Sequence, residues 1–145
     1  MLTVTGAGPM IADASDVESD LVTWARDWFD VLAAGRLAEA CARLDEPNHY
    51  GMRWTPEAIT ALLNETFSPG TVFAARHPEG PRFTSPRTAT GREGLDVGAF
   101  ADGSGFWLNY DIPLNGEFSD LTAQFEFRWR GPRTLAARLH DLHVM

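Results

Sequence analysis

Three side chains in the second half of the chain have the types that acid–base chemistry uses. His140 and Asp141 are adjacent, and Tyr110 lies within an apolar run. A histidine oriented by a carboxylate can act as a general base, and a buried phenol can donate to a developing oxyanion. His140, Asp141 and Tyr110 are therefore candidate catalytic residues. The structural alternative is that the first two satisfy the end of a sheet and that Tyr110 is a core tyrosine bonded to backbone.

Two further pairs could also carry chemistry. His140 and His143 are three residues apart, but on a strand they would point to opposite faces, and no third ligand is signalled, so we expect no metal site. Asp111 and Asp120 would face each other across the hairpin predicted below. Paired carboxylates raise each other's pKa and are useful in acid–base work, although such a pair is more often neutralised by arginine or separated by strand twist.

One loop gathers side chains that suit the mouth of a ligand pocket. His49, Tyr50, Arg53 and Trp54 combine hydrogen-bond donors with aromatic surface, although the same segment could be a packed connector between helices. If a pocket lies behind this loop, large side chains from the helices and the sheet would line it. We expect that lining to comprise Trp24, Trp28, Trp54, Tyr110, Phe125 and His140.

The charge balance is acidic and excludes several classes of partner. The chain has 145 residues, with 20 acidic side chains against 12 basic ones and a formal net charge of −8. Such a surface repels phosphate backbones and anionic lipids, so we expect neither nucleic acid nor membrane as a partner. Most of the excess lies in residues 1–72, which contain 11 acidic residues and four arginines.

Every basic residue is an arginine, which also narrows the chemistry. Without lysine the chain cannot form a Schiff base, anchor pyridoxal phosphate or complete a phosphate-binding P-loop, and we expect no cofactor. The only cysteine, Cys41, has no partner for an intramolecular disulfide and is expected to be a buried, inert residue of a helix face. No basic leader or membrane-length apolar run is present, so we expect a cytoplasmic protein.

Helical signals fill the first half of the chain. Residues 1–14 show no periodicity and are expected to form a flexible tail. A helix is predicted over 15–34, where a capping box is followed by an apolar stripe at helical spacing and Gly35 supplies the stop. A short helix is expected over 37–44. A third is expected over 55–67, with threonine at the N-cap and proline at the first helical position.

The second half predicts an antiparallel sheet. Asn115-Gly116 is typical of a two-residue hairpin turn that needs positive φ at both positions. Continuing the ladder from this turn places Leu108 opposite Ala123 and Phe106 opposite Phe125, so that the apolar side chains share one face.

The last strand carries a change of parity. Its apolar residues occupy odd positions up to Leu139 and even positions from Leu142 onward. A β-bulge at His140-Asp141 would reconcile the two halves, and bulges often re-aim side chains beside active sites. We expect it to turn one of these two side chains toward Tyr110. The stretch 76–94, rich in proline and glycine, is expected to be irregular.

Helices followed by a long bent antiparallel sheet, with a closing strand at the end of the chain, resemble the NTF2-like superfamily of ketosteroid-isomerase-like fold. The stretch 28–40 is similar to the opening helix pair of that superfamily. Four more stretches are similar to an uncharacterised bacterial domain family of the same size: 50–57, 113–117, 119–123 and 140–145. The resemblance implies a cone-shaped α+β fold around a pocket. It implies no activity, because the superfamily includes isomerases, dehydratases, cyclases, epoxide hydrolases and non-catalytic binding domains.

The sequence therefore predicts one α+β domain over residues 15–145 that binds a small organic molecule in an apolar pocket. Its catalytic version is cofactor-independent isomerisation, dehydration or cyclisation. One alternative is an acidic protein-binding module such as an immunity-type protein, which a filled core and an exposed acidic, aromatic patch would favour. The other is a homodimer formed through the outer face of the sheet, with Trp107 and Trp129 buried between subunits.

Overall fold

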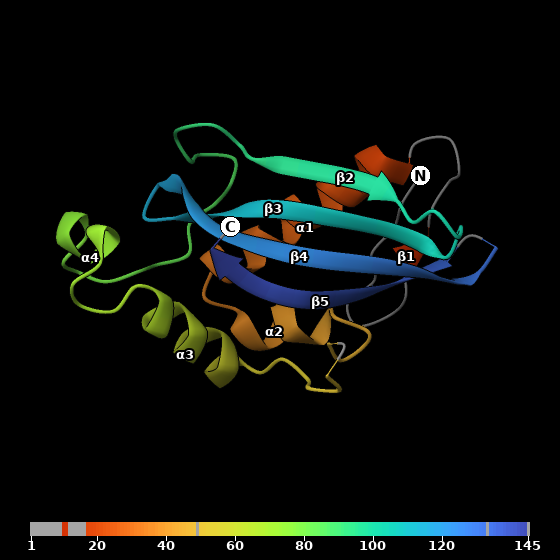
Figure 1. The fold of residues 1–145 in the computed structure, drawn as a ribbon, viewed down its shortest axis with the longest axis horizontal. Coiled ribbons are helices and arrows are strands. Elements are labelled where there is room, and N and C mark those ends of the chain that lie inside the picture. Colours follow the sequence, from red (N-terminus) through yellow and green to blue (C-terminus); the bar gives the residue numbers. More distant parts are fainter. Residues whose placement is uncertain (1–9, 12–16, 49, 133, 145) are drawn as a thin grey trace.

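An antiparallel sheet and the helices packed against it give the protein an α+β architecture, in a computed structural model that describes residues 10–11, 17–48, 50–132 and 134–144. The sheet has the strand order β1-β5-β4-β3-β2 (Figure 1). Its strands are β1 (Met10–Ile11), β2 (Leu95–Ala99), β3 (Gly105–Leu114), β4 (Glu117–Gly131) and β5 (Thr134–Val144). The two residues of β1 pair with the start of β5, so this part of the predicted tail belongs to the sheet.

The first helix follows the predicted apolar stripe. α1 (Val17–Ala33) buries Leu21, Trp24, Trp28 and Phe29 on one side. It ends before Gly35, whose φ of 80° is the left-handed conformation that commonly terminates helices. The serine of the predicted capping box, Ser15, lies outside the described residues.

The other helices are short and begin at side-chain caps or tight turns. α2 (Leu37–Ala42) follows α1 directly, and α3 (Pro56–Thr66) starts where Thr55 accepts a hydrogen bond from the Ala58 amide over 3.1 Å, as predicted. α4 (Val72–Arg76) was not predicted, because five residues are too few to show a helical period.

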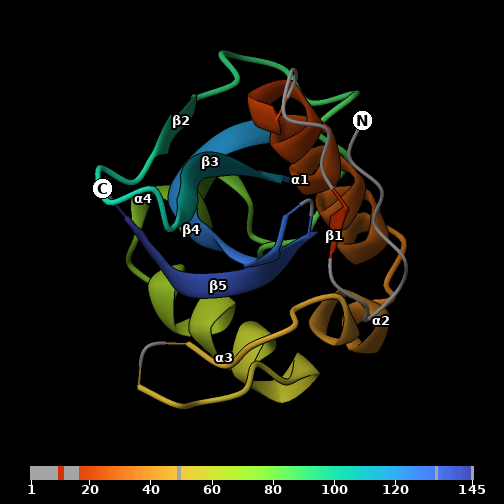
Figure 2. The same cartoon turned by 90° about the vertical axis from the view of Figure 1, so that its right-hand side faces the viewer.

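The helices cover the sheet on one face and along one edge. α1 crosses one face of the curved sheet, while α2 and α3 lie near β5 (Figures 1 and 2). The segment after α2 bonds directly to β5: the Asp45 amide donates to the Ala137 carbonyl over 2.9 Å, and the Ala137 amide donates to the Asp45 carboxylate over 2.8 Å. These bonds occupy backbone groups that an uncovered edge strand would leave open.

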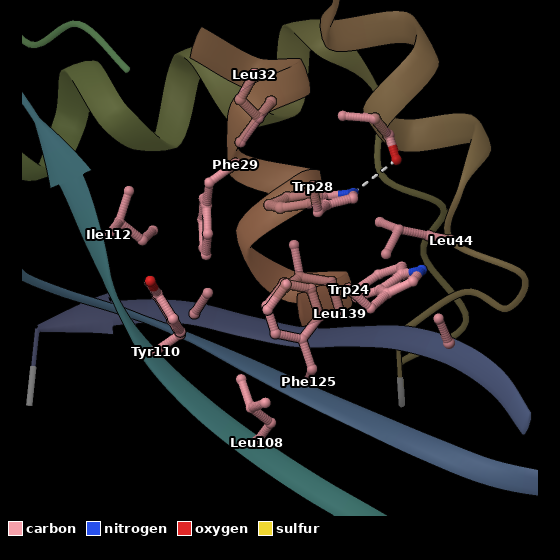
Figure 3. Packing of buried hydrophobic residues seen from close by; sticks show 14 of the residues in the cluster. Trp24, Trp28, Phe29, Leu32, Leu44, Leu108, Tyr110, Ile112, Phe125 and Leu139 are labelled. Atoms are coloured by element: carbon pink, nitrogen blue, oxygen red, sulfur yellow. Dashed lines mark hydrogen bonds between the residues drawn. The ribbon is translucent and has the colours of Figure 1, made fainter. Parts of the chain in front are cut away.

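Aromatic rings fill the space between α1 and the sheet (Figure 3). Trp24 and Trp28 each place a ring edge against Phe125, with centroids 5.4 and 5.3 Å apart, and Phe29 lies 5.0 Å from Tyr110. All five side chains are buried in one hydrophobic cluster. Trp24, Trp28, Tyr110 and Phe125 are therefore buried core residues, and their lining of a ligand pocket stays a prediction.

The β3–β4 hairpin has the predicted turn but a different register. Asn115 and Gly116 have φ values of 53° and 84°, and Leu114 pairs with Glu117 as expected. The ladder is then interrupted near Pro113, which has no N–H to donate, and beyond the irregularity Leu108 pairs with Phe125 rather than Ala123. The same shift places Phe106 opposite Phe127 instead of Phe125. A shift by two residues keeps each side chain on its predicted face, because a strand repeats every two residues.

The predicted break in β5 is confirmed. Gln124 pairs with Asp141 and Phe125 pairs with Leu139, so His140 is the extra residue of a β-bulge. The bulge lets Leu139 and Leu142 both be buried despite their different parity.

Candidate functional site

The bulge does not bring the three candidate catalytic residues together. His140 lines a cavity of about 260 Å³ with Trp107, Asn109, Gln124 and Glu126, which alternate with the buried residues of β3 and β4 and so mark the outer face of the sheet. Tyr110 is fully buried on the opposite face, against Phe29. We expected the bulge to turn His140 or Asp141 toward Tyr110. His140 instead faces the outer cavity.

Asp141 is engaged with its own strand. Its carboxylate accepts a hydrogen bond from the Leu142 amide over 2.8 Å, which helps to satisfy the backbone beside the bulge. This is the structural alternative for Asp141, in which its side chain satisfies polar groups of the sheet. His140 and Tyr110 therefore lie on opposite faces of the sheet and do not form one catalytic site.

The register shift also separates the predicted carboxylate pair. Asp111 pairs with Thr122, not with Asp120, and the Thr122 hydroxyl donates to the Asp111 carboxylate over 3.1 Å. Burial raises the pKa of Asp111, and the charge of Asp120 adds a smaller contribution in the same direction. The predicted direct opposition of two carboxylates is wrong, although their charges still interact.

The two tryptophans of the homodimer hypothesis lie on opposite faces of the sheet. Trp107 lines the outer cavity, and its ring covers Gly98, where an added Cβ would lie 2.6 Å from a ring carbon. Trp129 packs against the core and lies 5.8 Å from Phe106 between ring centroids. A dimer through the outer face would therefore bury Trp107 but not Trp129.

An ion-pair network that the sequence analysis missed links α1, the segment before β2, and β3. The Arg26 guanidinium donates from Nη2 to Glu93 Oε1 over 2.6 Å and from Nε to Oε2 over 3.1 Å. The Tyr110 hydroxyl also donates to Glu93 Oε2. In Figure 3 the phenol oxygen points away from Leu108, at the margin of the aromatic cluster. Tyr110 is thus a core tyrosine with a carboxylate partner rather than a backbone one.

This network fixes the charge states of its members. Hydrogen bonds from Arg26 lower the pKa of Glu93, and the bond from Tyr110 acts in the same direction. Burial, followed by the neighbouring carboxylate, raises the pKa of Tyr110. Glu93 is therefore an anion and Tyr110 a neutral phenol at neutral pH. A carboxylate of lowered pKa is a weak general base.

A surface cleft opens beside this network. It has a volume of about 420 Å³ and is lined by Arg26, Pro86, Arg87, Glu93 and Phe118. Arg87 is held by two carboxylates of α1, with its Nη2 2.8 Å from Asp27 Oδ1 and its Nη1 3.0 Å from Asp30 Oδ2. The volume falls within the range of about 300–1,000 Å³ that is usual for ligand pockets.

Arg26 and Glu93 carried only weak signals in the sequence. Arg26 follows Val22 by four residues and precedes Phe29 by three, which places it at the margin of the buried stripe of α1. Glu93 lies in the stretch 76–94, where no periodicity predicts the direction of a side chain. Their meeting is a long-range contact that no local pattern encodes.

The loop between α2 and α3 contains a hydrogen-bonded turn that displays two apolar side chains. Asn48 is buried, and its side-chain oxygen accepts from the Tyr50 and Met52 amides, each over 3.0 Å. Gly51 has a φ of 80°, which closes the turn. Tyr50 is 82% exposed and Met52 43% exposed. The neighbouring candidate, His49, lies outside the described residues.

A second cavity adjoins this loop. It has a volume of about 380 Å³ and is lined by side chains of α2 and the following loop, among them Cys41, Leu44, Asp45, Arg53 and Trp54. The Trp54 indole donates to the Leu139 carbonyl over 2.8 Å, so Trp54 is a fixed wall of this surface cavity rather than of an interior pocket. Cys41 is only half-buried, contrary to expectation, and burial raises the pKa of its thiol.

Three comparisons with known proteins add no relationship. No family profile, curated protein or solved structure matches the chain. In the described part of the chain no cluster of three or more histidine, cysteine or acidic side chains is arranged to hold a metal ion. No helix within the described residues is long and apolar enough to cross a membrane.

Proposed function

We propose that the protein is a binding module that recognises a partner protein through the surface formed by Tyr50, Met52, Arg53 and Trp54 with the adjoining cavity, here called the Tyr50 surface. The observation that carries the proposal is that Tyr50 is 82% exposed at the tip of a turn fixed by hydrogen bonds. Exposed tyrosine and methionine side chains are enriched at protein interfaces relative to other surfaces.

The construction of the turn supports this role. Asn48 holds the backbone of Tyr50 and Met52 before any partner arrives, and Trp54 ties the end of the loop to β5. A preorganised loop loses less conformational freedom on binding than a disordered one. The cavity of about 380 Å³ beside the loop can receive one large side chain from the partner.

The net charge of the chain favours a basic partner. The whole chain carries a net charge of −8; of the two acidic residues that line the cavity, Glu46 is paired with Arg130 over 2.7 Å and Asp45 accepts the bond from Ala137. Arg53 is the basic residue of the same lining. Long-range attraction accelerates encounter with a positively charged protein, and this acceleration weakens as salt is added.

Catalysis in an interior pocket has less support. Trp24 and Trp28 pack against Phe125 between α1 and the sheet, and His140 is on the other side of the sheet from Tyr110. A filled core together with an exposed aromatic patch is the arrangement expected of a binding module.

We further propose that the fold is an NTF2-like variant. Support comes from the order of its elements, with α1 to α4 preceding the bent antiparallel strands β2 to β5.

The test is a quantitative capture experiment followed by reconstitution. Tagged wild-type chain, Tyr50→Ala and the control Val72→Ala would be used to capture proteins from the source cell, since Val72 on α4 is 79% exposed and outside the Tyr50 surface. The captured protein must then be purified and titrated by calorimetry. We expect Tyr50→Ala to weaken binding by about tenfold or more and Val72→Ala to leave it unchanged. Equal binding of both variants, or no measurable binding by any purified candidate, would refute the proposal.

A further inference from the structure

We infer that the cleft lined by Arg26, Pro86, Arg87, Glu93 and Phe118 is a binding site for a small, uncharged, planar molecule with an amide-like edge, one that offers a carbonyl oxygen beside an N–H group. This site is separate from the Tyr50 surface and does not depend on it. The inference follows from the charges, the hydrogen-bonding capacity and the apolar wall of the cleft.

The charges of the cleft are matched in pairs. Arg26 is paired with Glu93, and Arg87 lies within 3.0 Å of both Asp27 and Asp30. A ligand with a net charge would have to compete with an existing partner for either guanidinium. An uncharged ligand meets no such competition and brings a smaller desolvation cost into the cleft.

Hydrogen-bonding capacity remains on both sides of the Arg26–Glu93 pair. Arg26 uses Nε and Nη2 on the carboxylate and also interacts with the Tyr110 hydroxyl, while its Nη1 makes neither of the two bonds to Glu93. Glu93 accepts from Nε, Nη2 and the Tyr110 hydroxyl, whereas a carboxylate has lone pairs for about four bonds. Both side chains line the cleft and remain partly exposed, so Arg26 can offer a donor and Glu93 an acceptor to one ligand, which is the complement of an amide edge.

The rest of the lining supplies an apolar surface. Phe118 of β4 and the buried Pro86 form this wall, and a flat ring can pack against an aromatic side chain or a proline. Phe118 also contacts Tyr110, with ring centroids 6.4 Å apart, so the wall is continuous with the core and held in place by it. A rigid wall beside a fixed polar pair favours planar ligands over flexible chains.

The network keeps this polar pair in one arrangement. Glu93 is joined at once to α1 through Arg26 and to β3 through Tyr110, and the backbone beside it is fixed because the Asp111 amide donates to the Gly94 carbonyl over 2.8 Å. The donor and the acceptor are thus positioned before a ligand enters, as specific recognition requires.

The test titrates defined fragments into the protein and follows both fragment binding and the backbone amide shifts of the protein by NMR. Benzamide and 2-pyridone serve as uncharged probes, and benzoate and benzylamine as charged probes of similar size. We expect the uncharged probes to bind wild-type protein about tenfold more tightly than either charged probe. Backbone amide shifts in the wild-type chain should change at Arg87, Glu93 and Phe118, which locates the site without any substitution.

Two variants then test the contributions of the Arg26–Glu93 pair and of the apolar wall to binding separately. Glu93→Gln and Phe118→Ala should each reduce binding of benzamide by about fivefold or more. The control Glu126→Gln removes a carboxylate that is likewise paired with arginine, 3.3 Å from Arg138, but on the outer face, and should leave binding unchanged. Stronger binding of a charged probe, shift changes confined to other residues, or no binding by any probe would overturn the inference.

Discussion

Trp54 donates its indole N–H to the backbone carbonyl of Leu139 over 2.8 Å and so joins the loop before α3 to the middle of β5. Replacing Trp54 with phenylalanine keeps an aromatic ring but leaves that carbonyl without its donor. We expect Trp54→Phe to lower the free energy of unfolding by about 1–2 kcal/mol. Hydrogen exchange should show faster exchange at the Tyr50 and Met52 amides, and unchanged exchange there would contradict the anchoring role of Trp54.

The Arg26–Glu93–Tyr110 network should give a pH-dependent contribution to stability. The pKa of Glu93 is lowered in the folded state, so its contribution is present above the ordinary carboxyl pKa of 4.5 and is lost as pH falls through the folded value. We expect Glu93→Gln to cost about 1 kcal/mol at pH 7, because the ion pair is partly exposed and therefore screened.

The measurement is urea unfolding of wild type and Glu93→Gln at several pH values. The difference between the two should shrink steadily as the pH falls below 4.5. The matched variant Glu126→Gln, for which the paired arginine lies 3.3 Å away, removes a carboxylate outside the network. A difference for Glu93→Gln that stays constant from pH 7 to acid would show that the effect is packing rather than charge.

Asp111 should behave in the opposite sense. Burial raises its pKa above the ordinary value of 3.8, so its ionisation destabilises the folded state as pH rises through the folded pKa. Asp111→Asn removes the buried charge and can still accept the bond from Thr122. We expect a gain of about 0.5–1 kcal/mol at pH 7 that disappears in acid, measured by the same unfolding titration. A loss of stability at pH 7 would disprove this assignment.

Cys41 offers a chemical probe of the Tyr50 surface. Its thiol is half-buried in the wall of the cavity and has a raised pKa, so the thiolate is scarce at neutral pH. We expect a thiol reagent to label native protein about tenfold more slowly than urea-unfolded protein. A bound partner should slow labelling further. Labelling at the unfolded rate in both states would contradict the described burial.

Local chemistry in the sequence was enough to predict the first three helices, the turn between β3 and β4, and the bulge in β5. Thr55 caps α3 through a bond within three residues, and Asn115-Gly116 forms its turn from its own backbone preferences. The parity change around His140 requires a bulge wherever the strand lies. These signals need no knowledge of the rest of the fold.

The register and the site depend on contacts that are distant in sequence. Pairing Leu108 with Phe125 instead of Ala123 leaves every side chain on the same face, so the hydrophobic pattern could not distinguish the two registers. The alternation of apolar residues in β5 predicted a bulge but did not predict which face of the sheet His140 would occupy. Glu93 meets Arg26 across 67 positions of sequence, and Trp24 meets Phe125 through packing that no spacing rule specifies.

The contacts that Asp45, Trp54 and β1 make with β5 limit strand addition along that part of its edge. Asp45 and Trp54 occupy backbone groups of Ala137 and Leu139, and β1 pairs with the first two residues of β5, while β2 is the strand at the opposite edge. Strand addition between two molecules would then join β2 to β2 by a two-fold axis. That joint consumes the β2 edge of both copies, so growth through β2 alone ends at a pair instead of propagating into a fibre.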